Sequence, residues 1–260
     1  MNIRLALAFI ISLVSCQVPA QVKPFNEENI EIGIVEKLES TIPMDLEFML
    51  EDGSRVSLNE HIDKPTILSF VYFDCPGMCG PLLAGVADVI TKLDMNLGED
   101  YDVITFSFDP KDSPDKARAE KANFVQQIDP KYWPHWNFLT SSQETINKIT
   151  NAVGWRYKAQ GLDFAHPSAI MIISPEGKIT RYLYGVSYLP FDVKMALIEA
   201  QKGIAQPTIN KILEYCFAYD PQGRGYTLQI TRIVGFFTII IALAIFVYLI
   251  VKGRRKTENK

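Results

Sequence analysis

The pattern of apolar and polar residues is most distinctive between positions 66 and 97. Residues 66–73 form an apolar run that is too short for a buried helix and rich in β-branched and aromatic side chains, which is typical of a central strand covered on both faces. Pro76 and Gly77 interrupt this run. From Pro81 to Leu97, apolar residues recur every three or four positions, which predicts an amphipathic helix. The turn between these two elements therefore lies at a helix N-terminus.

Turn and capping signals mark the other elements. The signals are Asp52-Gly53 for a hairpin within residues 48–58, Ser113 before Pro114 for a helix start, and Ser141 with Glu144 for a capping box. The elements expected are strands at 102–108 and 136–139, helices near 114–128 and 192–202, a helix after the capping box that carries Ile146, Ile149 and Val153, irregular chain at 155–168, and a hairpin at 169–184. This order predicts an α/β, thioredoxin-like fold with an inserted strand and helix.

Two further apolar runs suggest targeting to a membrane. The first follows Arg4 and has the shape of a secretory signal, which ends either in a cleavage site after Ala20 or in a lipoprotein box with Cys16 as the lipidated residue. The second run, residues 233–251, has no charged side chain and as a helix would span about 28 Å, close to the thickness of the hydrocarbon core. Lysine and arginine residues follow it directly, which predicts a cytoplasmic C-terminus.

These signals predict the following organisation of the chain. We expect a signal peptide at 1–20, an extended arm at 21–45, the thioredoxin-like domain at 46–202, a helix and juxtamembrane connector at 203–232, a transmembrane helix at 233–251 and a cytoplasmic tail at 252–260. The domain would then lie on the periplasmic side of a bacterial inner membrane. The net charge of −4 and the pI of about 5.5 argue against a nucleic-acid partner.

The turn after the first strand carries two cysteines in the motif Cys75-Pro-Gly-Met-Cys79. Unpaired backbone N–H groups and the helix dipole favour anions at a helix N-terminus, so a thiol there loses its proton more readily than a free thiol. The thiolate is the form that binds a metal ion or attacks a disulfide. A stabilising disulfide, or two buried thiols, is the alternative for this pair. Cys216, near the expected membrane surface, is interpreted as a packed thiol, and Met78 as an exposed turn residue.

Histidine supplies a third candidate ligand. His61 lies in a polar loop and His135 among aromatic residues, so both are interpreted as structural. His166 lies directly before the apolar strand of the final hairpin, and in a thioredoxin-like fold this loop faces the cysteine turn. Two thiolates and one imidazole suit copper, because thiolates select Cu(I) and imidazole also accepts Cu(II). Zinc accepts the same ligands, although its structural sites usually have four.

Three further segments accompany these ligand candidates. They are Phe108-Asp-Pro110, then Ser113-Pro114-Asp115, and Ser174-Pro-Glu-Gly177 after the strand that follows His166. In this combination, about residues 45–202 resemble the SCO/SenC family of membrane-tethered, thioredoxin-fold proteins, which bind copper and help assemble the binuclear copper centre of respiratory oxidases. The resemblance implies that Cys75, Cys79 and His166 bind copper, and that the partner is the copper-centre subunit of such an oxidase.

The sequence also departs from the family pattern. Gly77 and Gly80 stand where members commonly have an acidic residue and a proline, and the expected membrane helix is C-terminal rather than N-terminal, which suggests a divergent branch. Asp109 is a candidate for positioning the site, although helix capping explains it equally well. The first hypothesis is a copper metallochaperone, not a turnover enzyme. The second is a thiol-disulfide oxidoreductase that uses Cys75 and Cys79 to keep a partner's copper-binding cysteines reduced.

Overall fold

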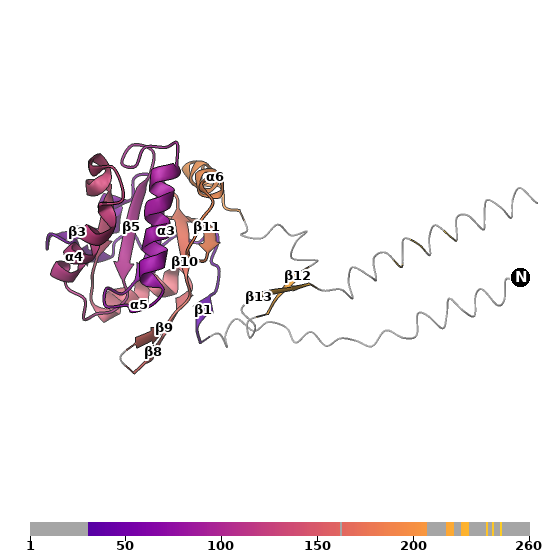
Figure 1. The fold of residues 1–260 in the computed structure, drawn as a ribbon, viewed down its shortest axis with the longest axis horizontal. Coiled ribbons are helices and arrows are strands. Elements are labelled where there is room, and N and C mark those ends of the chain that lie inside the picture. The colour runs from indigo at the N-terminus through magenta and orange to yellow at the C-terminus, as the bar shows by residue number, and fades with distance from the viewer. Residues whose placement is uncertain are drawn as a thin grey trace, which may run out of the picture. The chain divides into compact units, whose positions relative to one another are not determined.

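The centre of the fold is a five-stranded sheet (Figure 1). The computed structural model describes residues 31–161, 163–206, 217–220 and 225–228 and residues 238, 241 and 245. In the order β11-β10-β4-β5-β6, the strands are β11 (Ile179–Tyr184), β10 (Ala169–Ile173), β4 (Thr66–Val71), β5 (Asp102–Ser107) and β6 (Trp136–Leu139). The strands β4, β5 and β6 are parallel, whereas β10 runs antiparallel to both of its neighbours. This mixed α/β architecture is consistent with the thioredoxin-like fold that the sequence predicts.

The central strands are buried along their whole length. Every residue of β4, β5 and β10 is buried, as expected for apolar runs covered on both faces. The polar side chains among them pair with one another: the hydroxyls of Ser69 and Thr105 lie 2.9 Å apart, and the indole N–H of Trp136 donates to Thr105 Oγ1 at 2.9 Å. Because buried polar groups are costly without a partner, these contacts fix how β4, β5 and β6 align.

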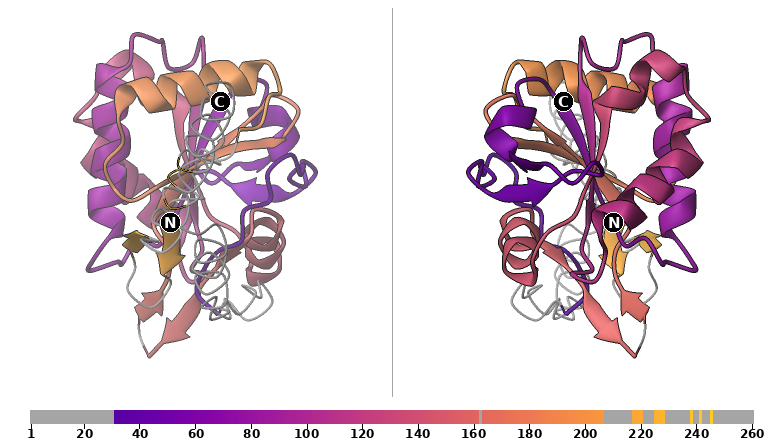
Figure 2. Two further views of the ribbon diagram at one scale, coloured as in Figure 1. Left: turned by 90° about the vertical axis from the view of Figure 1, so that its right-hand side faces the viewer. Right: turned by 90° about the vertical axis from the view of Figure 1, so that its left-hand side faces the viewer.

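Helices cover both faces of the sheet. The helices are α2 (Leu58–His61), α3 (Cys79–Lys92), α4 (Pro114–Val125), α5 (Gln143–Ala152) and α6 (Pro190–Gln201), with a 3-10 helix, η2 (Pro130–His135). The helices α3 and α4 lie side by side on one face, and α5 lies on the other (Figure 2). The side chain of Ser113 accepts the N–H of Lys116, so α4 begins where the sequence predicts.

The described residues also form four two-stranded sheets. The pairs are β1 (Gly33–Ile34) with β7 (Trp155–Arg156), β2 (Glu47–Met49) with β3 (Arg55–Ser57), β8 (Lys158–Gln160) with β9 (Asp163–Ala165), and β12 (Phe217–Asp220) with β13 (Gly225–Leu228). The β2–β3 hairpin confirms the turn expected at Asp52-Gly53, where Gly53 has a φ of +89°.

The structure corrects three expectations. The chain after Gly154, expected to be irregular, forms β7, β8 and β9. Ser142, not Ser141, caps α5, because the Ser141 hydroxyl donates to the carbonyl of Glu47 and is held in the neighbouring hairpin. The helix α3 ends at Lys92; Leu97 is buried all the same, from the loop that follows, which explains why it continued the apolar pattern.

The ends of the chain fall mostly outside the described residues. The signal peptide with Cys16, the connector residue Cys216, most of the expected membrane span at 233–251 and the tail at 252–260 lie there. Within the described residues, no helix combines the length and the apolar character needed to cross a membrane. The described part of the expected arm contributes to the folded domain, because β1 pairs with β7 and Ile42 is 1% exposed.

Candidate functional site

The order of the sheet brings the cysteine turn and His166 to the same edge. The turn follows the end of β4, and His166 comes three residues before β10. Because β10 pairs antiparallel with β4, the start of one strand lies beside the end of the other, as the pairing of Ile170 with Ser69 shows. Segments about ninety residues apart in the sequence therefore meet at one point, in agreement with the expectation for a thioredoxin-like fold.

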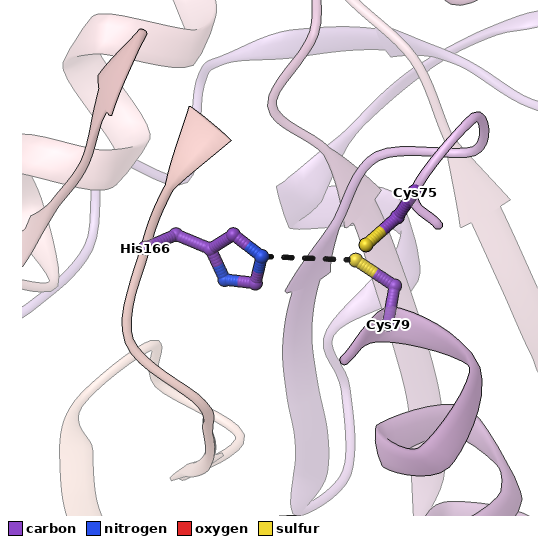
Figure 3. A group of neighbouring side chains, drawn as sticks. All are labelled: Cys75, Cys79 and His166. Carbon is purple, nitrogen blue, oxygen red and sulfur yellow. Dashed lines mark hydrogen bonds between the residues drawn. The ribbon is translucent and has the colours of Figure 1, made fainter. Parts of the chain in front are cut away.

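Two thiols and one imidazole converge there (Figure 3). One ligand atom from each of Cys75, Cys79 and His166 lies within 4.8 Å of the other two, and the distance from Cys79 Sγ to His166 Nε2 is 4.0 Å. Cys79 is the first residue of α3 and is 2% exposed, whereas Cys75 is partly exposed. The cluster is therefore buried on the Cys79 side and reaches the surface on the Cys75 side.

A hydrogen bond fixes which imidazole nitrogen faces the thiols. His166 Nδ1 lies 2.9 Å from the backbone carbonyl of Pro167. A carbonyl can only accept, so in the neutral ring Nδ1 carries the proton and Nε2 keeps its lone pair. Because Nε2 is the atom beside Cys79, the ring presents a ligand lone pair to the two sulfurs. This is how protein metal sites commonly orient a histidine ligand.

Aromatic rings hold the imidazole in place. The ring of His166 meets Tyr72 edge-on at 5.9 Å and Phe108 at 5.2 Å, and stacks on Trp155 at 6.3 Å between ring centres. Phe164 packs against Tyr72 and Phe108 from the strand that leads to His166. A rigid aromatic surround limits the rotation of the ring, so its approach to the thiols is set before any metal binds.

The pKa values of the two thiols are shifted in opposite directions. Burial by itself would raise the pKa of Cys75, but hydrogen bonds from the Cys79 thiol and from the backbone N–H groups of Cys79 and Gly77 outweigh it and lower that pKa. Burial, followed by the neighbouring Cys75, raises the pKa of Cys79 well above its ordinary value. Cys75 is therefore the nucleophilic thiol of the pair, and Cys79 keeps its proton until something replaces it.

A buried carboxylate anchors the segment that enters the cysteine turn. Asp112, whose side chain is 1% exposed, accepts the backbone N–H of Phe73 at 2.9 Å and the hydroxyl of Ser107 at 2.6 Å. Lys116 lies 3.3 Å from the other oxygen of Asp112 and also pairs with Asp74, the residue before Cys75. Asp112 and Lys116 thus join the start of the turn to β5 and α4, a role that the sequence did not reveal.

The other candidates lie apart from this cluster or serve the fold. The Asp109 carboxylate accepts the N–H of Lys111 at 2.9 Å and closes the turn after β5. Ser113, not Asp109, caps the helix that follows, so the helix-capping interpretation of Asp109 is wrong. His135 lies 3.5 Å from Asp102 at the start of β5, the opposite end of the parallel strands from the cysteine turn. Met78 is 47% exposed, as expected for a turn residue.

Comparisons with known proteins show what this chain is similar to as a whole. The curated SCO1 protein homolog of Bacillus subtilis (strain 168) is 29% identical over 150 residues, which are 56% of this chain and 75% of the Bacillus protein. A crystal structure of a protein from Aquifex aeolicus VF5, proposed to act in electron transfer, is 32% identical with a TM-score of 0.59 and covers 64% of this chain and 95% of its own.

Another solved structure is that of BsSco, described as a member of the Sco family of cytochrome c oxidase assembly proteins with a disulfide switch. It is 25% identical with a TM-score of 0.53, and the match covers 64% of this chain and 96% of that one. The model of the SCO1/SenC family matches residues 36–190. This match includes β4, the cysteine turn and β10, and it spans more than half of the chain, which therefore belongs to the SCO1/SenC family.

Proposed function

We propose that this protein binds one copper ion through Cys75 Sγ, Cys79 Sγ and His166 Nε2 and passes it to the copper-centre subunit of a respiratory oxidase. The observation that carries the proposal is the convergence of these three atoms within 4.8 Å. Thiolates are the ligands that Cu(I) prefers, and the imidazole allows Cu(II) as well. Copper is the cargo in this proposal, so the protein acts as a metallochaperone rather than a turnover enzyme.

The number of ligands favours copper over a structural zinc ion. Among the described residues, the cluster offers three groups of ligating type, whereas structural zinc sites are almost always closed by four. A three-ligand site with one accessible side suits a metal that has to leave. The partly exposed Cys75 is followed by Pro76, Gly77 and Met78, all exposed, so a ligand from a partner can approach the sulfur at this turn.

Similarity to an oxidase assembly protein supports the choice of an oxidase subunit as the copper recipient. BsSco is described as belonging to the cytochrome c oxidase assembly proteins, and its match covers nearly the whole of that chain. The signal peptide expected at 1–20 and the membrane span expected at 233–251 would hold the domain on the periplasmic side of the inner membrane. A copper-centre subunit that faces the same compartment could then be reached without release of the domain.

A second function, thiol-disulfide exchange, is favoured by the asymmetry of the two thiols. Cys75 is partly exposed and has a lowered pKa, and Cys79 is buried behind it. In this reaction the Cys75 thiolate attacks a disulfide of the partner, one partner sulfur leaves, and the Cys79 thiol then displaces the other. The partner gains two electrons and becomes a dithiol, while Cys75 and Cys79 become a disulfide.

One substitution separates the two functions. His166→Ala removes a metal ligand and leaves both thiols, so copper affinity of the purified, reduced protein should fall sharply while the Cys75–Cys79 disulfide still forms and exchanges. His135→Ala, at the opposite end of β5, is the matched control and should bind copper as the wild type does. Cells carrying His166→Ala should lose assembly of the dependent oxidase.

The reduction potential of the variant is measured beside these results, because an imidazole near the pair can also shift the thiol pKa. Normal oxidase assembly by His166→Ala with an unchanged potential would reject the copper-donor function and favour the reductant. Loss of copper binding in His135→Ala but not in His166→Ala would show that the site itself has been misplaced.

A further inference from the structure

A hydrogen bond joins the two segments that carry the candidate ligands. The hydroxyl of Tyr72 donates to Oδ1 of Asp163, and the same oxygen accepts the backbone N–H of Phe164 at 2.7 Å. Tyr72 comes directly after β4 and three residues before Cys75, and Asp163 opens β9 three residues before His166. The bond therefore links the cysteine segment to the histidine segment at equal distances along the chain from their ligands.

The bond lies in the aromatic cluster that surrounds His166. The ring of Tyr72 is 4% exposed and contacts Phe164 at 5.1 Å and His166 at 5.9 Å, both edge-on. In contrast, among the described strands β8 and β9 form a separate two-stranded sheet, and every residue of β8 is exposed. Packing contributes little to the far side of this hairpin, so a contact at its base has a large share in fixing where the chain enters the site.

We propose that Tyr72 and Asp163 form a latch that holds the β8–β9 hairpin against the end of β4 and thereby sets the distance from His166 to the two thiols. This inference rests on the proposed copper site and names two positioning residues for it; neither is a ligand. With the latch closed, Nε2 lies within reach of both sulfurs. With the latch open, the hairpin moves on its own and the imidazole spends less time at the ligand position.

The chain offers matched variants for a test. Tyr72→Phe removes the hydroxyl, which also hydrogen-bonds the Cys75 thiol, and keeps the ring that packs on His166. Asp163→Ala removes the acceptor and leaves the tyrosine hydroxyl in the chain, so it is the more selective of the two variants. Asp163→Asn keeps an oxygen that can accept both hydrogen bonds, so it should behave as the wild type does. Tyr157→Phe is the control for loss of a tyrosine hydroxyl in the same aromatic cluster, because the Tyr157 hydroxyl contacts Gln143 rather than Asp163.

Cu(I) affinity is measured by competition with a chromogenic chelator, using the reduced full chain in a mild detergent. Tyr72→Phe and Asp163→Ala should weaken binding about tenfold, the lower end of the range for residues that orient a metal ligand. Asp163→Asn and Tyr157→Phe should stay within about twofold of the wild type, because neither breaks the latch.

The decisive comparison repeats Asp163→Ala in a chain that already carries His166→Ala. If the latch acts by placing His166, the second loss disappears, and Asp163→Ala should change the affinity by less than about twofold in that background. An equal loss in both backgrounds would mean that Asp163 supports the fold in general, and no loss in either would mean that the bond has no part in binding; each result overturns the latch.

Amide hydrogen exchange of the metal-free protein tests the latch independently of copper binding. In the metal-free protein, Tyr72→Phe and Asp163→Ala should speed amide hydrogen exchange of Asp163–Ala165, whereas Asp163→Asn and Tyr157→Phe should not. Unchanged exchange in the first two variants rejects the latch even if copper binds. Failure of the wild type to bind copper, with faster exchange in these variants, rejects the proposed function and leaves the latch standing.

Discussion

Asp112→Ala should destabilise the domain and loosen the cysteine turn. The substitution removes the acceptor of the Phe73 N–H and of the Ser107 hydroxyl, and the carboxylate beside Lys116. The Ser107 hydroxyl already lies 3.4 Å from the carbonyl of Asp109 and can turn to it, so its loss is small. For the Phe73 N–H, the acceptor among the described residues is Asp112 Oδ2, at 2.9 Å.

The size of the effect follows from these contacts. A buried donor left without an acceptor costs about 1–3 kcal/mol, so Asp112→Ala should lower the free energy of unfolding by about 2–3 kcal/mol once the smaller losses are included. Asp112→Asn keeps an oxygen for Phe73 and Ser107 and loses only the ion pair, at about 1 kcal/mol. Lys116→Met should cost about the same or less, since the Lys116 side chain is 39% exposed and such pairs contribute little.

Urea unfolding followed by circular dichroism measures these differences, with the midpoint read at a common slope. Asp94→Ala is the control, because it removes a carboxylate that is 75% exposed and pairs with Lys194; its midpoint should not move measurably. Copper affinity should fall more in Asp112→Ala than in Asp112→Asn, because the position of Cys75 depends on the turn that Asp112 holds. An Asn variant as unstable as the Ala variant would refute the argument, since the carboxylate's charge, not its acceptor role, would then matter.

Three other results are expected. Gly154→Ala should lower the free energy of unfolding, measured in urea, by about 3 kcal/mol, because a Cβ at Gly154 would lie 1.8 Å from a backbone carbonyl oxygen. Gly161→Ala is the control, because Gly161 has nearly the same φ but open space around it, and should cost only about 1 kcal/mol. Equal losses in the two variants would show that this contact does not matter. Copper affinity should rise about tenfold per pH unit for each proton released, because burial raises the pKa of Cys79 and metal must displace that proton; a flat profile from pH 6 to 9 would contradict this. A reporter active only in the cytoplasm should work when fused after Lys260 and fail after Tyr226; the reverse pattern would overturn the membrane topology.

Local signals explain what the sequence could predict. The strand at 66–71 and the helix after it were visible because an apolar run, two breaking residues and a helical period follow one another directly. The β10–β11 hairpin was equally clear, since Ser174-Pro-Glu-Gly177 ends in a glycine that the structure places at φ +79°. In contrast, β8 is exposed at every position and so lacks the alternation that marks a half-buried strand.

The supporting residues of the site depend on contacts that no local pattern encodes. The Tyr72–Asp163 bond spans 91 residues and the Phe73–Asp112 bond spans 39. Asp109 was the better candidate from sequence alone because it directly ends a strand, yet it is Asp112 that turns back to the chain entering the cysteine turn. The ligand candidates themselves could be named in advance, because the fold that the sequence predicts brings their two loops together.

Cys79 and His166 are 87 residues apart, and this separation affects how the unfolded chain can bind metal. A nascent or denatured chain keeps its two thiols close together but holds no imidazole near them, because closing so long a loop carries an entropic cost that β4–β10 pairing must offset. If Cys75, Cys79 and His166 are the ligands, as proposed, full metal affinity develops only with the completed sheet. Bound metal in turn favours the folded state by mass action. In the proposed copper site, an incomplete or misfolded copy would compete poorly for scarce metal, so folding would act as a quality check on metal loading.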